Sequence, residues 1–456
     1  MERRRLVIIG AGPTGLGAAW RLRELGERDF VVLDAASEPG GLARSFRDER
    51  GFTWDLGGHV LFSHYPYFDA ALRTAVGDDG WYHHQREAWA RMYGAWVPYP
   101  VQNNLRHLPR EVLVKCVQGL VRAARGGGER PENFAQWIDA TFGAGLADVF
   151  MRPYNFKVWA YPPESMSWSW ISERVAVTDL ERVLTNVLLE QDDVSWGPNN
   201  TFQFPKEGGT GAVWRAVAKR VGPEHLRLGA RVGAVDTRRK VVRLSDGEAL
   251  GYDALISTMP IDRLFSVMEP RDELARGEAS RLVHSSTHVV GLGLEGGPPP
   301  SLATKCWMYF PEGNTPFYRA TVFSNYSPAH VPEPRRYWSL MTETSESPEK
   351  PVLAARLVAD TIDGAIASGL IESRAQVASV WAHRMEYGYP TPSLERDAHL
   401  ARLLPALERH DVFSRGRFGA WKYEVSNQDH SFMQGVEVVN RLLLQEPETT
   451  LSSSGR

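Results

Sequence analysis

The stretch RLVIIGAGPTGLGAAWRLRELGERDFVVLD, residues 5–34, predicts the fold of the N-terminal part of this chain. Residues 5–9 form a short apolar run of the kind that makes a buried parallel strand. A glycine-rich turn follows, and residues 16–25 have the spacing of a helix before a second apolar run at residues 30–33. Together these segments predict one strand–helix–strand unit, and hence an α/β domain.

The turn reads Gly10-Ala11-Gly12-Pro13-Thr14-Gly15 and fits the dinucleotide fingerprint of a Rossmann-like domain. In that fingerprint the first glycine permits the tight turn, the second lets the backbone approach a pyrophosphate, and the third lets the helix pack on the strand. The helix N-terminus offers N–H groups to phosphate oxygens. Asp34 follows where a carboxylate accepts hydrogen bonds from the adenosine ribose. We therefore predict a dinucleotide site, with a purely structural turn as the alternative.

Two further segments favour FAD over NAD. The segment EPGGLA, residues 38–43, resembles the second glycine pair of the glutathione-reductase-like FAD-binding family, and residues 252–258 resemble a later strand of that family. The resemblance predicts that Gly41 and Leu42 contact the cofactor, whereas an ordinary loop is the alternative. A flavin carries the difficult chemistry itself, so the protein needs only to bind and orient it.

Composition and charge exclude several classes of protein. The chain has 456 residues and a formal net charge of -3, which gives no general attraction to nucleic acid or anionic membranes. The sequence contains no run of 18 apolar residues, so we predict no transmembrane helix. We interpret the N-terminal MERRRLVIIGAG as a strand rather than a signal peptide. Cys116 and Cys306 form neither a metal-binding pair nor a disulfide framework, so we predict a cytoplasmic protein.

The rest of the chain changes character twice. Residues 109–125, 132–150 and 172–190 show helical patterns and predict a helical domain. Within residues 285–345, three segments rich in β-branched and aromatic residues predict strands of an antiparallel sheet. Residues 344–351 are polar and are predicted to form an exposed loop, and residues 446–456 a frayed tail.

Eight stretches, in order along the chain, resemble UDP-galactopyranose mutases, in particular the fungal and protozoan branch of that family. They are WDLGGHVLFSHY (54–65), WVPYPVQNN (96–104), FMRPYNFKVWAYP (150–162), FPKEGGTGAVW (204–214), FYRATVFSNYS (317–327), YGYPTP (387–392), SRGRFGAWKYE (414–424) and NQDHSFMQGVE (427–437). With the N-terminal turn they are distributed from about residue 6 to residue 440, nearly the whole length of the chain, and eight motifs in the order of one family are not a coincidence.

The resemblance implies an FAD-dependent enzyme that interconverts the pyranose and furanose forms of a nucleoside-diphosphate hexose. In the family the flavin must be reduced, and its N5 attacks the anomeric carbon while the diphosphate leaves, without net oxidation. This chemistry needs neither a Ser–His–Asp set nor a metal. The implied fold is α/β, or α+β overall. It comprises a glutathione-reductase-like FAD-binding domain (1–80, 200–280, 410–445), a helical domain (105–195) and an antiparallel-sheet substrate domain (81–104, 281–409).

Two arginines, Arg174 and Arg319, match the diphosphate contacts of the family. Arginine suits a departing diphosphate because its planar fork stays cationic and donates two hydrogen bonds at once. Without the family, Arg174 is interpreted as a surface ion pair on a helix, and Arg319 as a solvent-facing strand residue. Four tyrosines match further diphosphate contacts through their hydroxyls, with core packing as the alternative: Tyr309, Tyr326, Tyr389 and Tyr423.

Other matched positions surround the base, the sugar and the flavin. Tyr99 and Phe150 match the pair that sandwiches the base, and Gln102 matches the residue that reads its edge. His59, after two glycines, matches the histidine that meets the flavin near N5. Positions near the ribose, phosphates and sugar, for which a packed helical core is the alternative, are Asn155, Trp159 and Asn199. The remaining predicted cofactor contacts are Gly58, Val232, Arg417, Asn427 and Gln428, whereas Asp429 and His430 are given no role.

Two positions depart from the fungal pattern. Val101 lies beside the predicted base slot where that branch carries an aromatic residue, so a GDP-hexose is an alternative substrate and a neutral core substitution the other interpretation. Ala88 replaces a serine near the reductant site but Arg86 is retained, so NADPH is a candidate reductant. Rival functions are a flavin oxidoreductase, such as an amine oxidase or desaturase, and a non-catalytic flavin- or nucleotide-sugar-binding protein. A homo-oligomer remains open.

Overall fold

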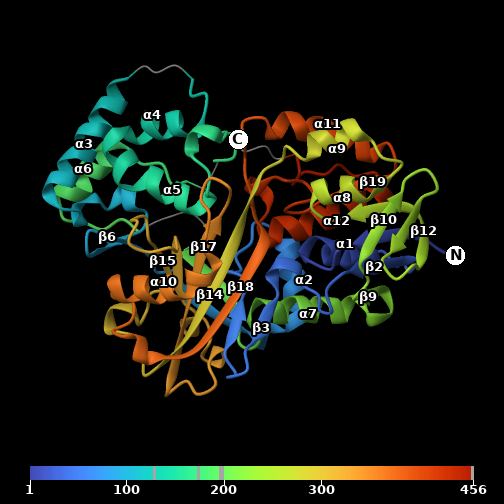
Figure 1. The fold of residues 1–456 in the computed structure, drawn as a ribbon, viewed down its shortest axis with the longest axis horizontal. Helices are drawn as coiled ribbons and strands as arrows, with labels where there is room; N and C mark the ends of the chain where they lie inside the picture. Colours follow the sequence, from blue (N-terminus) through green and yellow to red (C-terminus); the bar gives the residue numbers. More distant parts are fainter. Residues whose placement is uncertain (127–129, 172–174, 195–199, 453–456) are drawn as a thin grey trace.

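The computed structural model describes residues 1–126, 130–171, 175–194 and 200–452. Figure 1 shows a layered α/β part that contains the N-terminus, a central sheet of long strands, and a helical lobe beside that sheet. The predicted class, α/β with a helical part and a sheet part, is confirmed.

The first sheet is built around the N-terminal strand–helix–strand unit. Its strand order is β13-β10-β11-β12-β1-β2-β9, and β19 also pairs with β12. β1 pairs in parallel with both β2 and β12, as its apolar run predicted, whereas β11 is antiparallel to β10 and β12. The strands are β1 (Glu2–Ile9), β2 (Phe30–Asp34), β9 (Leu226–Leu228), β10 (Val232–Asp236), β11 (Val241–Leu244), β12 (Ala249–Ser257), β13 (Met268–Glu269) and β19 (Val412–Ser414).

Alternate residues of β1 face opposite sides of this sheet. Leu6 and Ile8 pack in one core cluster with α1, α2, α7 and α12, whereas Val7 and Ile9 pack in another with α8, α9 and α11. Burial on both faces explains why the strand consists of consecutive apolar residues. The helices are α1 (Pro13–Glu24), α2 (Pro66–Val76), α7 (Gly209–Val221), α8 (Ile261–Val267), α9 (Glu273–Ala279), α11 (Arg396–Glu408) and α12 (Gln428–Leu444).

The second sheet has seven strands in the order β18-β14-β17-β16-β15-β6-β7. Adjacent strands of this sheet are antiparallel, except for β15 and β6, which run in parallel. The strands are β6 (Ala88–Met92), β7 (Ala95–Pro98), β14 (His284–Glu295), β15 (Trp307–Tyr309), β16 (Arg319–Val322), β17 (Tyr337–Glu346) and β18 (Val377–Pro390), and helix α10 (Ala354–Ala367) packs on this sheet. Two small sheets join β3 (Ser45–Arg47) with β4 (Thr53–Asp55) and β5 (Trp81–Gln85) with β8 (Thr201–Pro205).

The prediction of an exposed loop over residues 344–351 is wrong at its start. Ser345 lies within β17, and both Ser345 and Ser347 are buried. Their hydroxyls donate to the carbonyl oxygens of Val158 and Ala160, at the end of α5 (Arg152–Trp159). Because the last carbonyls of a helix lack partners within it, buried serines satisfy them here.

In its described residues the helical lobe contains three further helices, namely α3 (Arg110–Arg125), α4 (Phe134–Leu146) and α6 (Leu180–Leu188). The first two agree with predicted segments, although a π-helical turn, Ala147–Met151, separates α4 from α5. The helix predicted over residues 172–190 begins only at Leu180 in the described part of that segment. Asp179 sets this start because its side chain accepts a hydrogen bond from the Arg182 N–H at 2.8 Å.

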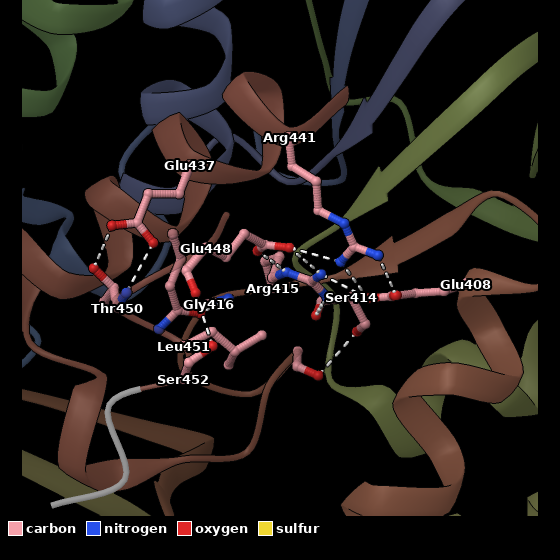
Figure 2. Close-up of polar contacts among 12 residues, drawn as sticks. Glu408, Ser414, Arg415, Gly416, Glu437, Arg441, Glu448, Thr450, Leu451 and Ser452 are labelled. Carbon is pink, nitrogen blue, oxygen red and sulfur yellow. Dashed lines mark hydrogen bonds and ion pairs between the residues drawn. The ribbon is translucent and has the colours of Figure 1, made fainter. Parts of the chain in front are cut away.

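The tail that was predicted to fray from residue 446 is held in place at Glu448 and Thr450, whereas its other residues are mostly exposed. Thr450 is buried and donates hydrogen bonds to Glu437, while Glu448 pairs with the buried Arg415 (Figure 2). A polar composition suggested solvent exposure, but buried polar partners hold these side chains in place. Among the described residues, no helix combines the length and hydropathy that a bilayer crossing requires.

Candidate active site

A cavity of about 790 Å³ is bordered by the α/β part, the long-stranded sheet and the helical lobe. Most residues predicted to contact the cofactor or the substrate line this one cavity. They are Gly10, Gly12, Pro13, Thr14, Asp34, Gly41, Leu42, Gly58, His59, Tyr99, Gln102, Phe150, Asn155, Trp159, Val232, Tyr309, Arg319, Tyr389, Arg417, Tyr423, Asn427 and Gln428.

The glycine turn in the cavity wall has room only for backbone. Gly10 has a φ of +103°, and a Cβ on it would lie 2.0 Å from Thr258 Oγ1. Gly15 does not line the cavity, because it packs under the turn, where its Cβ would lie 1.8 Å from the Gly10 carbonyl oxygen. Gly41 comes so close that its Cβ would lie 3.1 Å from Gly12 Cα. No side chain caps the start of α1, so this narrow groove and its N–H groups fit a pyrophosphate.

Asp34 ends β2 at the cavity wall, with its carboxylate oriented by backbone. Its oxygens accept hydrogen bonds from the N–H groups of Ala11 and Ala36, both at 2.7 Å. An ionised carboxylate has about four acceptor sites, so it can still accept from ribose hydroxyls. The position and remaining acceptor capacity of Asp34 therefore fit the adenosine end of FAD.

Arg417 and Gln428 contribute to the wall from the C-terminal part of the chain. Arg417 donates to the Gly388 carbonyl oxygen at 3.2 Å, and its guanidinium carbon lies 4.9 Å from the centre of the Tyr389 ring. Gln428 Oε1 accepts a hydrogen bond from Trp214 Nε1 at 2.7 Å. These contacts hold both side chains in defined positions at the cavity.

Arg319 lies in a buried cluster with Glu343, a residue that sequence reasoning missed. Arg319 Nε donates to Glu343 Oε1 at 2.7 Å, and Arg319 Nη2 donates to Oε2. The same carboxylate accepts from the Gly58 N–H and from the Tyr318 hydroxyl, each at 2.8 Å. Burial alone would raise the pKa of Glu343, but the Arg319 charge and these hydrogen bonds hold it below the usual range.

His59 lies beside this cluster and is half-buried, with its Nδ1 atom out of contact with solvent. Burial lowers the pKa of His59 to about 4, since the nearby Arg319 and Arg417 charges add to burial while Glu343 opposes it. His59 is therefore neutral near pH 7, and its Nδ1 has no hydrogen-bond partner among the described residues. A Cβ on Gly58 would lie 3.1 Å from Thr321 Oγ1, which explains the glycine before this histidine.

Aromatic rings surround the part of the cavity next to the helical lobe. Tyr99 and Tyr309 have ring centres 4.6 Å apart, and Phe150 stacks on Tyr154 at 5.3 Å. Trp159 meets Tyr423 edge to face at 4.7 Å. Tyr154 and Tyr318 also line the cavity and were missed, because in the sequence they look like ordinary core aromatics.

Gln102 and Asn155 reach the cavity from 3-10 helical and α-helical segments of the lobe. Gln102 Nε2 donates to the Ala176 carbonyl oxygen, whereas its buried Oε1 meets no donor in the described part of the chain. Asn155 Nδ2 donates to the Met151 carbonyl oxygen at 2.7 Å. Gln102 thus presents an acceptor that a ligand N–H can satisfy.

Arg86 adds a second guanidinium to this region. Its Nη2 donates to the Tyr309 hydroxyl at 3.2 Å. The guanidinium carbons of Arg86 and Arg319 lie 4.7 and 4.6 Å from the ring centre of Trp307. Both charges therefore contact one indole ring in the cavity wall.

Two predicted substrate residues do not line the cavity. Tyr326 is fully buried, and its hydroxyl donates to the Cys306 carbonyl oxygen at 3.1 Å. The alternative interpretation, a tyrosine packed in the core, therefore fits better than a diphosphate contact. Val101 is also fully buried and packs in the core of the helical lobe, in the same cluster as Phe150 and Tyr99. Arg174 and Asn199 lie outside the described residues.

A His–Asp–His group, also missed from the sequence, lies next to the predicted cofactor contacts of α12. His64, Asp429 and His430 bring one potential ligand atom each within 4.8 Å of one another. Asp429 Oδ2 already accepts from the His64 backbone N–H at 3.1 Å and lies 2.7 Å from His64 Nδ1. Although burial opposes it, hydrogen bonds from His430 and His64 hold the pKa of Asp429 well below its usual range. The group therefore holds the loop that ends at residue 65 against α12.

Comparison with known proteins agrees with this geometry. A family model described as flavin containing amine oxidoreductase matches residues 13–293. A solved structure described as reduced UDP-galactopyranose mutase is 50% identical, with a TM-score of 0.96, over 100% of this chain and 97% of that chain. A putative protoporphyrinogen oxidase from Exiguobacterium sp. 255-15 is 15% identical, with a TM-score of 0.71, over 98% of this chain and 100% of that chain, and shows the fold alone.

Two curated relatives match only a segment of 60 residues. They are the zeta-carotene-forming phytoene desaturase of Myxococcus xanthus, 42% identical, and Lysine-specific histone demethylase 1 of Caenorhabditis elegans, 38% identical. The segment is 13% of this chain and spans 11% and 8% of those proteins, respectively.

Proposed function

Because the chain belongs to the flavin containing amine oxidoreductases and, at 50% identity over its full length, to the UDP-galactopyranose mutase family, we propose that it interconverts the pyranose and furanose forms of a UDP-linked hexose. The chain is an FAD-dependent enzyme of the mutase class with a nucleotide-sugar substrate. The reaction itself and the roles of individual residues in it are proposed below.

The observation that carries the proposal is the single cavity. Cofactor groups around Gly12 and Asp34 and substrate groups around Arg319 and Tyr99 border the same space, so a flavin and a nucleotide sugar can meet there. The narrow backbone groove, the oriented carboxylate and the unpartnered His59 Nδ1 fit FAD in the described residues. Reduced FAD, when bound, would supply the nucleophile that displaces the nucleoside diphosphate from the sugar.

Arg319 would hold the departing diphosphate. Glu343 uses two of the five N–H donors of this arginine, which orients the planar fork and leaves three donors. Because Glu343 already orients the guanidinium group through two contacts, little reorganisation is needed when charge develops on the leaving group. Arg174 is proposed as the second arginine, on the family resemblance alone.

Tyrosine hydroxyls would complete the diphosphate site. Tyr309, Tyr389 and Tyr423 border the cavity, and burial raises the pKa of Tyr389, so this phenol stays a neutral donor near pH 7. Tyr99 and Phe150 are proposed to enclose the base, and Gln102 Oε1 to accept from its edge. Arg86 is proposed to assist NADPH as the reductant, since it lines the same cavity.

The test is anaerobic incubation of the dithionite-reduced enzyme with UDP- and GDP-hexoses, with products analysed by chromatography and mass. We expect an isomer of unchanged mass from a UDP-hexose, and none from the oxidised enzyme. Isomerisation by the permanently oxidised enzyme would contradict the proposal. Turnover of GDP-hexoses alone would move the substrate class to guanine nucleotides. Val101 does not border the cavity but packs in one cluster with Tyr99 and Phe150, so GDP-hexoses are the alternative substrates in this test.

The match to the flavin containing amine oxidoreductases gives one alternative reaction, the oxidation or desaturation of a substrate. An oxidase or desaturase consumes one oxidant for each product and changes the mass of its substrate by two hydrogens. A mutase consumes no oxidant, and it needs a reductant only once, to reduce the flavin before turnover begins. Oxygen uptake in step with product formation would therefore favour the rival.

A further inference from the structure

The segment that follows α12, residues 446–452, contacts two loops that line the cavity. Glu448 is its main charged contact: the carboxylate, only 6% exposed, accepts from Arg415 Nη2 at 2.7 Å and from Arg441 Nη1 at 2.9 Å. Arg415 is fully buried and also donates to Glu408 at 2.7 Å. Figure 2 shows the two carboxylates and the two guanidinium groups facing one another. The tail thus supplies one of the two carboxylates in a partly buried network.

Arg415 lies two residues before Arg417, which lines the cavity. Its N–H donates to the Ser257 carbonyl oxygen at the end of β12, and the next N–H, of Gly416, donates to Gln434 Oε1 at 2.8 Å. Gly416 has a φ of +89°, and a Cβ on it would lie 2.4 Å from Thr14 Oγ1, in the first turn of α1. Arg417, the following residue, lines the cavity. A shift of Arg415 would therefore displace a segment that touches the predicted pyrophosphate turn.

Thr450 connects the tail to the second loop. Its N–H donates to Glu437 Oε2 at 2.9 Å, and its hydroxyl donates to Glu437 Oε1 at 2.8 Å. The Tyr65 hydroxyl lies 3.0 Å from the Thr450 hydroxyl and can donate to it. Tyr65 follows His64, which Asp429 holds, and the same loop carries His59. The tail therefore holds the end of the loop whose other part borders the cavity.

We propose that residues Glu448–Thr450 are a positioning element, which holds the loops 57–65 and 414–418 at fixed positions and thereby sets the retention and reduction potential of the flavin. This rests on the proposed function, because it takes FAD as the occupant of the cavity. Two loops far apart in sequence meet through one short segment, so a change in the segment reaches both.

The main experiment compares Glu448→Gln with Glu446→Gln in the holoenzyme. Glu446 is a matched control, since it is exposed and its carboxylate bonds to Asn440 on α12, away from both loops. We expect Glu448→Gln to speed FAD release, measured as recovered free-flavin fluorescence after dilution, by about tenfold, as for other partners that orient binding groups. Its visible flavin spectrum and two-electron reduction potential should also shift. The control should match the parent protein in all three measurements.

A purely structural role gives a different result. If Glu448→Gln lowers the unfolding temperature but leaves FAD release, spectrum and potential as in the control, the proposal is overturned. If the parent protein retains FAD and isomerises the sugar while Glu448→Gln behaves like it, only this inference fails. If the parent binds no FAD, the proposed function itself fails.

Tyr65→Phe keeps the inference testable if Glu448→Gln does not fold. This variant removes one hydroxyl and no charge, so it should fold and speed FAD release about fivefold, the effect of one hydrogen bond. Tyr65→Phe should add little to Thr450→Val, because Thr450→Val already removes this contact together with the hydrogen bond from the Thr450 hydroxyl to Glu437. Full additivity, or no change in FAD release with Tyr65→Phe, would contradict the link through Thr450.

Discussion

Arg319, whose side chain is 14% exposed, and Arg415, which is fully buried, each pair with a glutamate that is nearly buried, yet their surroundings differ. Arg319 shares one carboxylate, that of Glu343, and lies at the cavity beside tyrosines and Trp307. Arg415 shares Glu448 and Glu408 with Arg441, so that two positive charges meet two negative ones. Arg319 keeps donors for a ligand, whereas the charges around Arg415 are already matched. Burial and pairing alone do not distinguish a binding residue from a structural one; the donors that remain do.

The largest effect is expected for the stability of the second network. Arg415→Met should leave the nearly buried Glu448 and the half-buried Glu408 with Arg441 as their shared cation, and should lower the free energy of unfolding by about 3–5 kcal/mol. Denaturant titration of the holoenzyme measures this. An unfolding free energy equal to that of the parent would show that the network is not needed for stability. An exposed pair offers a control, since Arg263→Met, in the Arg263–Glu386 pair, should cost about 1 kcal/mol or less.

Arg319 should instead be decisive for turnover. Arg319→Ala should lower kcat by about 100- to 1000-fold, the cost of losing one oriented donor to a developing charge, while FAD content stays near that of the parent. Rapid-quench assays and flavin absorbance separate these quantities. Arg319→Lys keeps the charge but not the planar fork, so we expect its kcat to lie between the two. Unchanged turnover in Arg319→Ala would remove this residue from the site.

The pH dependence of stability should also distinguish cavity from core. The folded protein keeps His59 and His330 neutral down to about pH 4, whereas both protonate near pH 6.5 when unfolded. The unfolded state thus binds more protons below pH 6.5, so acidification to pH 4 should lower stability, by up to about 3 kcal/mol for each histidine.

Substitution tests each contribution. His59→Gln should reduce the slope between pH 6.5 and 4 and leave stability at pH 8 close to that of the parent. His330→Gln should reduce the same slope but also cost stability at pH 8, since His330 Nδ1 bonds to the Phe323 carbonyl oxygen at 2.8 Å. Equal slopes in all three proteins, from urea titrations at each pH, would exclude these histidines as the source.

The smallest functional effect is expected at Val101. Val101→Phe should overpack the core of the helical lobe and lower the free energy of unfolding by about 1–3 kcal/mol. The ratio of the dissociation constants for UDP and GDP, measured by calorimetry, should stay within twofold of the parent value. A clear shift toward UDP would restore Val101 as a determinant of base size.

The sequence by itself determined what depends on neighbouring residues. The turn at Gly10–Gly15, the first strand–helix–strand unit and Asp34 follow from local conformational preferences and spacing, and they appear where they were predicted. The resemblance of eight stretches identified the family, because they are contiguous motifs in a constant order. The individual substrate roles remain proposals.

Only the tertiary structure decided what depends on distant residues. Glu343 receives hydrogen bonds from Gly58, 285 positions away, and from Arg319, and no local pattern marks such a partner. Ser347 and Thr450 look exposed by composition, but each is buried against polar groups of another element. Local sequence sets backbone preferences and the alternation of polar and apolar residues. The free energy of a buried charge or hydroxyl depends on the partner that the fold brings to it.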